Sequence, residues 1–132
     1  MKKPESVDEY IAACPADVQV VLERIRSIGR SAIPRGEERL SYRIPAFARD
    51  GRIVFYYAAF RHHIGIFPPV RGDAALMKAL APYRGDKGNL SFPLNERMPY
   101  GLIRRVAKAQ LKAQVARQTA RPARPSRARR SR

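Results

Sequence analysis

Two stretches in the middle of the chain decide its fold: SYRIPAF at residues 41–47 and FYYAAFRHHIGIFP at residues 55–68. They hold most of the chain's aromatic residues and both of its histidines. Aromatic residues favour strands, because their rings pack well on a pleated, half-buried surface. The two stretches therefore indicate a β-rich core with a polar fringe, formed by Ser41, Tyr42, His62 and His63.

A hairpin accounts for the second stretch. Asp50-Gly51 is the signal of a tight turn, and the strand predicted after it, 53–60, is apolar at both odd and even positions. A half-exposed strand would alternate with polar residues, so this strand is central. It is either covered on both faces, or covered on one face and lining a groove on the other. A turn at Arg61-His62 leads to a returning strand at 63–67, and residues 38–48 form a preceding extended pair bent at Pro45.

Helices are predicted on both sides of this region. Ser6 and Glu9 have the spacing of a capping box, and apolar stripes predict helices over 6–13 and 15–32, the second weakened near its end by Gly29. Asp73 is a candidate cap for a short helix that Pro82 ends. A strand follows at 90–94, and a last helix begins near Pro99 and fades near residue 116. Hairpin-linked strands with helices outside them predict one α+β domain with an antiparallel sheet, packed by N-terminal and C-terminal helices.

Positive charge is concentrated at the C-terminal end of the 132-residue chain. The net charge is +16, and residues 113–132 contain seven of the 27 basic side chains and none of the 11 acidic ones. After Val115 this segment has no large apolar residue, so burial cannot offset the entropy lost on ordering it. The sequence therefore predicts a folded domain at 1–112 and a disordered, Arg-rich tail at 113–132.

The basic tail has two interpretations. It is either a solvated segment that keeps a basic protein soluble, or a contact for nucleic acid whose affinity is blind to sequence and falls steeply with salt. In the second case the tail would contact phosphates together with the last helix, through Arg104, Arg105, Lys108 and Lys112. The candidate nucleic-acid-binding residues are Arg104, Arg105, Lys108, Arg117, Arg121, Arg124, Arg127, Arg129 and Arg130.

Cysteine usage and the apolar runs bear on location. The single cysteine, Cys14, excludes an internal disulfide and fits a reducing cytosol. No signal peptide is visible, and no apolar run approaches the length of a membrane span. We therefore expect a cytoplasmic protein. Cys14 itself is either a small buried residue or a thiol activated at a helix N-terminus.

Three polar residues are candidate ligand contacts: Tyr42, His63 and Lys87. Lys87 lies in Arg84-Gly85-Asp86-Lys87-Gly88, which has the glycines and lysine of an anion-binding loop but not the full phosphate-loop pattern. Together the three would form a small-molecule site between sheet and helices. Each has a structural alternative: His63 as a strand-end residue bonded to a carbonyl or to Tyr42, and Lys87 in a plain turn. Pocket lining and core packing are both open for the nearby rings of Tyr42, Phe55, Tyr57 and Phe67.

No catalytic or closed metal site is predicted. Ser41 lacks the elbow motif of a serine nucleophile, and the adjacent His62 and His63 project to opposite faces of a strand, so they do not chelate one ion together. We expect neither enzymatic activity nor a cofactor. The acidic residues at 5–17 and 37–38 either favour helix N-termini or form a weak surface iron site.

Several short motifs occur in a fixed order along residues 5–112. They are Tyr10-Ile11-Ala12-Ala13 with Pro15, Ser41-Tyr42 with Pro45-Ala46-Phe47, Ala58-Ala59-Phe60 with His63-Ile64-Gly65, Lys87-Gly88, Phe92-Pro93, and Pro99-Tyr100 with Leu102-Ile103. In order and spacing these motifs resemble the YdhG-like domains, which are small bacterial proteins of largely unknown function. The resemblance implies a curved antiparallel sheet, and because one branch has been described as frataxin-like iron chaperones, it makes iron a candidate partner. The Arg-rich tail and the strong positive charge lie outside the family pattern.

Overall fold

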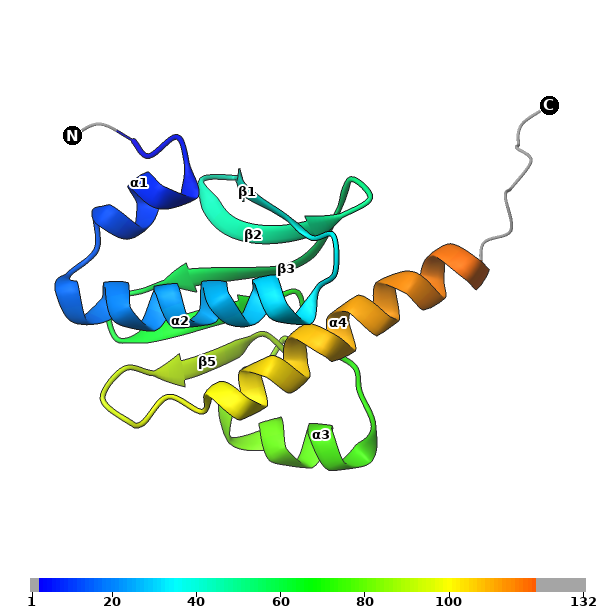
Figure 1. Ribbon diagram of the computed structural model, residues 1–132. Helices are drawn as coiled ribbons and strands as arrows, with labels where there is room; N and C mark the ends of the chain where they lie inside the picture. Colours follow the sequence, from blue (N-terminus) through cyan, green and yellow to red (C-terminus); the bar gives the residue numbers. More distant parts are fainter. Residues whose placement is uncertain (1–2, 121–132) are drawn as a thin grey trace.

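The computed structural model describes residues 3–120, which form helices around one sheet (Figure 1). The N-terminal helices are followed by four strands, two short helices, a fifth strand and a long C-terminal helix. In chain order the elements are α1 (Val7–Ala12), α2 (Ala16–Ala32), β1 (Glu37–Ser41), β2 (Ile44–Arg49), β3 (Arg52–Ala59), β4 (His63–Phe67), α3 (Ala74–Leu80), the 3₁₀ helix η1 (Ala81–Tyr83), β5 (Leu90–Pro93) and α4 (Tyr100–Ala120).

The sheet is a five-stranded antiparallel meander in the order β1-β2-β3-β4-β5. It is curved and open, and α2 and α4 lie side by side on one of its faces (Figure 1). The predicted α+β fold is therefore confirmed. Residues directly opposite each other in neighbouring strands share a face, so the register sorts side chains into an inner face towards the helices and an outer face away from them.

The inner face carries the core. The rings of Phe47, Phe55 and Tyr57 are buried and in mutual contact, with centroids 5.5–5.9 Å apart. Gly29 was predicted to weaken α2, but it lies buried inside the helix, where a Cβ would come within 2.2 Å of the Phe47 ring. Its missing side chain lets α2 approach β2, and the contact with Phe47 offsets the low helix propensity of glycine.

Helix starts follow the predicted signals. The Ser6 hydroxyl accepts a hydrogen bond from the Glu9 N–H (3.1 Å), and the Asp73 carboxylate accepts one from the Leu76 N–H (2.8 Å). These bonds satisfy N–H groups that the first turn of a helix leaves free. Pro15 lies at the N-cap position of α2, so the helix begins at Ala16, one residue after the predicted start.

The first hairpin corrects a prediction. The chain turns at Tyr42-Arg43, both with positive φ (53° and 62°), and Pro45 lies inside β2 opposite Leu40 rather than at a bend. Residues other than glycine rarely adopt positive φ, so no turn signal is visible at Tyr42-Arg43 in the sequence. The Asp50-Gly51 turn between β2 and β3 is as predicted.

Helix α4 is longer than predicted, because it continues to Ala120 rather than fading near residue 116. Residues 113–120 of the predicted disordered tail are therefore helical. The buried Gln114 amide donates to the carbonyl oxygens of Arg52 (3.0 Å) and Arg49 (3.4 Å), and Gln110 donates to the Pro68 carbonyl oxygen (2.7 Å). These polar contacts fix the helix to the sheet where large apolar residues are missing. Residues 121–132 lie outside the described residues, and their disorder stays a prediction.

Across residues 3–120, none of the helices combines the length and the apolar character needed to cross a bilayer.

Candidate functional site

The arginines of α2 contact side chains of neighbouring elements. Arg26, whose side chain is only 11% exposed, forms ion pairs with Asp8 (2.7 Å) and Glu38, and Arg30 pairs with the same Glu38. Burial by itself would lower the pKa of Arg26, but the hydrogen bonds to Glu38 and Asp8 outweigh it and raise that pKa above its ordinary value. Arg24 lies 4.7 Å from the centroid of the Tyr100 ring at the start of α4. These arginines hold α2 against α1, β1 and α4.

The basic side chains between α3 and α4 are arranged differently from those of α2. A groove of about 530 Å³ lies between these helices, with Leu76 and the small side chains of α4 as its apolar part. Its basic lining comes from α4 and from the segment before α3: Arg71, Arg105, Lys108 and Lys112. Within residues 3–120 none of these four cations forms an ion pair. We refer to this feature as the α3–α4 groove.

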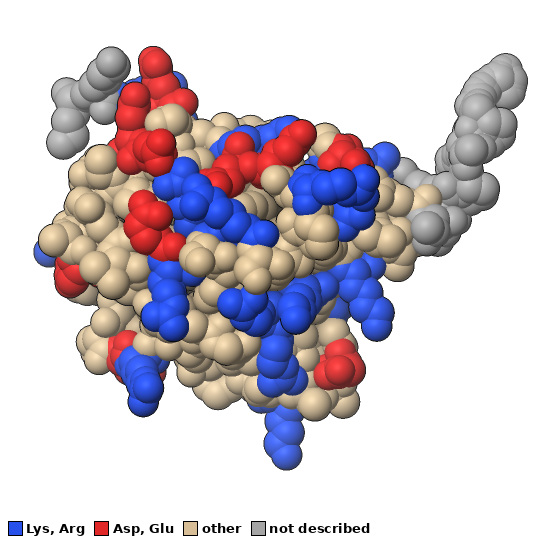
Figure 2. Space-filling model, viewed as in Figure 1, with Lys and Arg blue, Asp and Glu red and all other residues tan. Residues whose placement is uncertain are grey.

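One carboxylate, Asp73, also lines the α3–α4 groove. Its Oδ1 atom accepts the hydrogen bond from Leu76 that caps α3, so this oxygen is already used. The groove therefore keeps an excess of positive charge. Figure 2 shows the wider contrast: acidic and basic side chains are interleaved over α1 and β1, whereas the surface over α4 is mainly basic.

The predicted nucleic-acid-binding residues divide into groups. Arg105 and Lys108 line the α3–α4 groove. Arg104 does not, because its guanidinium donates to the Ser31 hydroxyl of α2 (3.1 Å). Arg117 is exposed on the last turns of α4. The other candidates, Arg121, Arg124, Arg127, Arg129 and Arg130, lie outside the described residues.

Arg71 was missed by sequence reasoning, whereas Lys112 was predicted as a phosphate contact of the last helix. Lys112 follows Lys108 by one helical turn, so the spacing on α4 was a usable signal. Arg71 lies far from α4 in the sequence and had no such signal, because only the packing of α3 on α4 brings it to the groove.

The three predicted ligand contacts do not share one pocket. Tyr42 is 88% exposed at the turn between β1 and β2. His63 begins β4, opposite Pro93, whereas Lys87 precedes β5 near the other end of that strand pair, where Leu90 lies opposite Ile66. Lys87 is exposed in a turn closed by the Gly88 N–H donating to the Gly85 carbonyl oxygen (2.9 Å). The prediction of a single site formed by these three was wrong, because it had no information on strand order.

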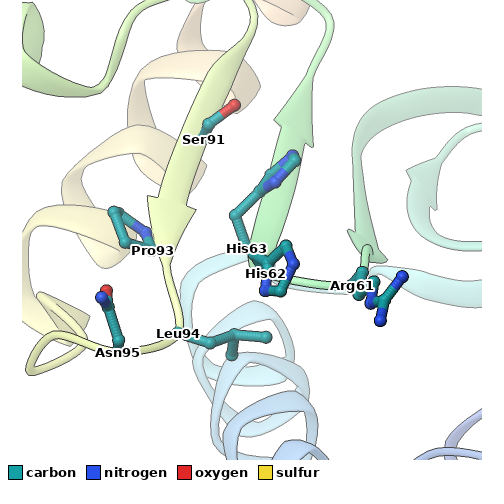
Figure 3. Close-up of a pocket in the computed structure, with 7 residues that line it drawn as sticks. All are labelled: Arg61, His62, His63, Ser91, Pro93, Leu94 and Asn95. Carbon is teal, nitrogen blue, oxygen red and sulfur yellow. The ribbon is translucent and has the colours of Figure 1, made fainter.

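His63 stacks on Phe60, with ring centroids 4.8 Å apart and an interplanar angle of 22°. It lines two adjoining hollows on the outer face, of about 630 and 290 Å³, which also share Ser91. Figure 3 shows His63 and Ser91 projecting from the neighbouring strands β4 and β5, with Arg61 beyond His62 and its guanidinium directed away from β5. We refer to the two hollows together as the outer-face trough.

The predicted pocket aromatics are also separated by the sheet. Phe55 and Tyr57 belong to the buried inner face, and the half-buried Phe67 lies on the outer face, stacked on Tyr56 at 5.1 Å. Strand β3 therefore faces the helices on one side, while Tyr56 is half-buried beside Phe67 on the other.

Metal ligands do not gather in the part of the chain that the structure describes. No group of three or more His, Cys, Asp or Glu side chains there is placed to hold a metal ion. Of the predicted acidic clusters, Asp8 and Glu38 are paired with Arg26. Cys14 is half-buried, its thiol donates to the Tyr10 carbonyl oxygen (3.4 Å), and burial raises its pKa, which disfavours a reactive thiolate.

Comparisons with known proteins place the fold. No family model matches the sequence, and no curated protein matches it significantly. Among solved structures, the crystal structure of YdhG from Bacillus subtilis, a protein of the DUF1801 family, matches with a TM-score of 0.67 over 82% of this chain and 90% of that chain. The chain has a YdhG-like fold. The sequence identity is 14%, so the likeness concerns the fold.

The resemblance read from the motifs is thereby confirmed at the level of the YdhG-like fold. That fold explains the meander and the two helices on its inner face. It assigns no ligand, so a function for this YdhG-like domain has to be argued from its own side chains.

Proposed function

We propose that this YdhG-like domain is a non-catalytic nucleic-acid-binding protein, and that the α3–α4 groove holds the phosphate backbone. The observation that carries the proposal is the set of four cations in the groove, Arg71, Arg105, Lys108 and Lys112, which have no ion-pair partner in residues 3–120. Cations without carboxylate partners are free to replace the counterions of a polyanion.

The spacing of the cations on α4 supports this proposal. Arg105, Lys108 and Lys112 line the same groove, and seven residues of helix span about 10 Å. Phosphates along one strand are separated by about 3.4 Å of helix rise, so this row of cations matches the length of about three phosphates. The apolar part of the groove provides no base-reading side chains, which favours binding that is independent of sequence.

The direction of the chain adds to the argument. Helix α4 runs to Ala120, and the sequence that follows, residues 121–132, contains six arginines and no acidic residue. The groove and this segment would contribute to one salt-dependent interaction. A cytoplasmic location, where nucleic acid is available, is part of the proposal.

Iron handling is supported by the motif resemblance alone, since the described residues gather no ligand set. If the chain is an iron chaperone, ferrous iron should bind tightly and substitution of Asp8 and Glu38 should abolish that binding. We expect no such binding, because both carboxylates are engaged with Arg26.

Binding of a short fluorescent DNA duplex, followed by anisotropy at physiological salt, tests the nucleic-acid proposal. The variant carries Arg105→Glu, Lys108→Glu and Lys112→Glu. The matched control carries Lys3→Glu, Arg35→Glu and Arg43→Glu, which change net charge equally at exposed sites away from the groove. We expect the groove variant to bind at least about tenfold more weakly than the control, because each lost phosphate contact lowers affinity.

Both variants are also made in a chain that ends at Ala120, which keeps all of α4 and the Gln114 contacts. The groove effect should persist in this shorter chain. Equal weakening by the groove and control variants would show that only net charge matters, and loss of all binding in the shorter chain would assign binding to residues 121–132 instead.

A further inference from the structure

We propose that the outer-face trough is a second binding site, independent of the α3–α4 groove, and that it takes a small planar aromatic anion. The trough lies along β4 and β5 on the face of the sheet opposite α2 and α4. His63 and Ser91 line both of its hollows, and these two residues would therefore lie at the centre of a bound molecule.

Aromatic rings that line the trough favour a planar aromatic ligand. Phe60 stacks on His63, yet it remains 49% exposed. Its place depends on Gly65, because a Cβ at that position would come within 2.7 Å of the Phe60 ring. Phe67 lines the same hollow and stacks on Tyr56. Offset-stacked rings with open surface favour a further planar ring.

The charge of the side chains that line the trough favours an anionic ligand. Arg61, His62 and His63 line the larger hollow, and among residues 3–120 no Asp or Glu lines either hollow. A cationic ligand would find no counter-charge there, whereas a carboxylate or phosphate would. Arg61 is exposed at the rim and directed away from β5 (Figure 3), so a bound carboxylate would draw its guanidinium inward to form a charge-assisted hydrogen bond.

The volume of the trough and its hydrogen-bonding groups further define the class of ligand. The two hollows measure about 290 and 630 Å³, and small-molecule sites typically occupy about 300–1,000 Å³ with a few polar groups that fix orientation. Ser91 and the amides of Asn89 and Asn95 are such groups. The site therefore fits one or two fused rings that carry an acidic substituent.

Indole-3-acetate is a direct probe of this site. The chain contains no tryptophan, so indole emission can be excited selectively and its anisotropy reports binding to the full-length protein. Tryptamine and indole-3-acetamide carry the same ring with a positive charge and with no charge. We expect indole-3-acetate to bind at least about tenfold more tightly than tryptamine, with the neutral amide between them.

Substitutions in the trough and matched substitutions outside it test where indole-3-acetate binds. Phe60→Ala removes the stacking ring and should weaken indole-3-acetate about fivefold, whereas Tyr42→Ala, the matched exposed aromatic on the neighbouring hairpin, should have no effect. Arg61→Gln should weaken the anion about threefold because the side chain is exposed, while Arg43→Gln should not. Gly65→Ala adds a Cβ whose nearest neighbour is the Phe60 ring, so it should displace that ring and weaken binding as Phe60→Ala does.

Two results would overturn the proposal. One is equal binding of indole-3-acetate and tryptamine, which would remove the charge argument. The other is equal weakening by Phe60→Ala and Tyr42→Ala, which would show non-specific attraction to a basic protein. Replacing Arg105, Lys108 and Lys112 by Gln should leave indole-3-acetate binding intact, so that failure of this site and failure of the groove are distinguishable.

Discussion

Helices α2 and α4 lie side by side on the same face of the sheet, and both carry several basic residues, but their cations have different surroundings. Arg26 and Arg30 of α2 share the Glu38 carboxylate. Arg105 and Lys108 of α4 border the α3–α4 groove, where Asp73 is the only carboxylate contributed by the described part of the chain and already caps α3. The number of basic residues on a helix therefore does not reveal its role. The carboxylates that the fold places beside them do.

Packing differs between the two helices as well. Gly29 of α2 faces the Phe47 ring at a distance that leaves no room for a methyl group, whereas a Cβ at Gly101 of α4 would meet nothing within 4 Å. Helix α2 is thus built into the core through both its apolar and its charged side chains. Helix α4 has a buried face and an exposed basic face.

Arg26→Met should have the largest effect on stability. It removes the ion-pair partner of Asp8 and one of the two arginine partners of Glu38 while keeping an unbranched apolar stem, and we expect a loss of about 3 kcal/mol in the free energy of unfolding. Urea denaturation measures this loss. The double variant with Glu38→Gln should recover part of it, and DNA affinity should stay unchanged. A loss below about 0.5 kcal/mol would place these charges among ordinary surface pairs.

Gly29→Ala and Gly101→Ala form a matched pair across the comparison. The same substitution should destabilise by about 2 kcal/mol at Gly29, where it overpacks against Phe47. It should stabilise by about 0.5 kcal/mol at Gly101, where only helix propensity changes. Thermal unfolding of both variants measures the difference. Effects of the same sign would contradict the described packing of α2.

Tyr57→Phe tests the packing of the inner face of the sheet, which α2 and α4 cover. The Tyr57 ring is fully buried, and its hydroxyl has no hydrogen-bond partner in the described part of the chain. Removing this hydroxyl should stabilise the protein by about 1 kcal/mol at neutral pH, because an unsatisfied buried polar group is costly.

The same variant carries a pH dependence. Burial raises the pKa of Tyr57 well above its ordinary value, and the nearby Glu38 carboxylate adds to this. An unfolded chain would ionise Tyr57 above about pH 10 while the folded chain would not, so folded-state stability falls as pH rises beyond that point. The advantage of Tyr57→Phe should widen above about pH 10 in urea denaturation series. A constant difference at all pH values would show that the hydroxyl is not sealed from solvent.

Local signals explain what the sequence predicted correctly. Ser6 and Asp73 cap helices through contacts three residues away, and Asp50 and Gly51 themselves adopt the positive φ values of the turn between β2 and β3. The two-sided apolar pattern of 53–60 correctly indicated a central strand. In each case the residues that determine the structure are neighbours in the chain.

The features that the sequence did not predict depend on residues that lie far apart in the chain. Gln114 holds α4 by reaching the turn between β2 and β3, and Arg104 is diverted to Ser31 of α2. The α3–α4 groove needs Arg71, which only tertiary packing brings to α4. The candidate site could therefore be predicted only in part: the cations of the last helix were visible in the sequence, but which of them remain unpaired depends on contacts between distant segments.

The central claim, that unpaired cations of α4 bind phosphate, is tested most directly by the salt dependence of DNA binding. The measurement compares the chain ending at Ala120 with the same chain carrying Arg105→Gln, Lys108→Gln and Lys112→Gln. Each phosphate contact contributes about 0.9 to the slope of log affinity against log salt, so the account predicts a slope smaller by roughly 2 to 3 in the variant. An unchanged slope would contradict it.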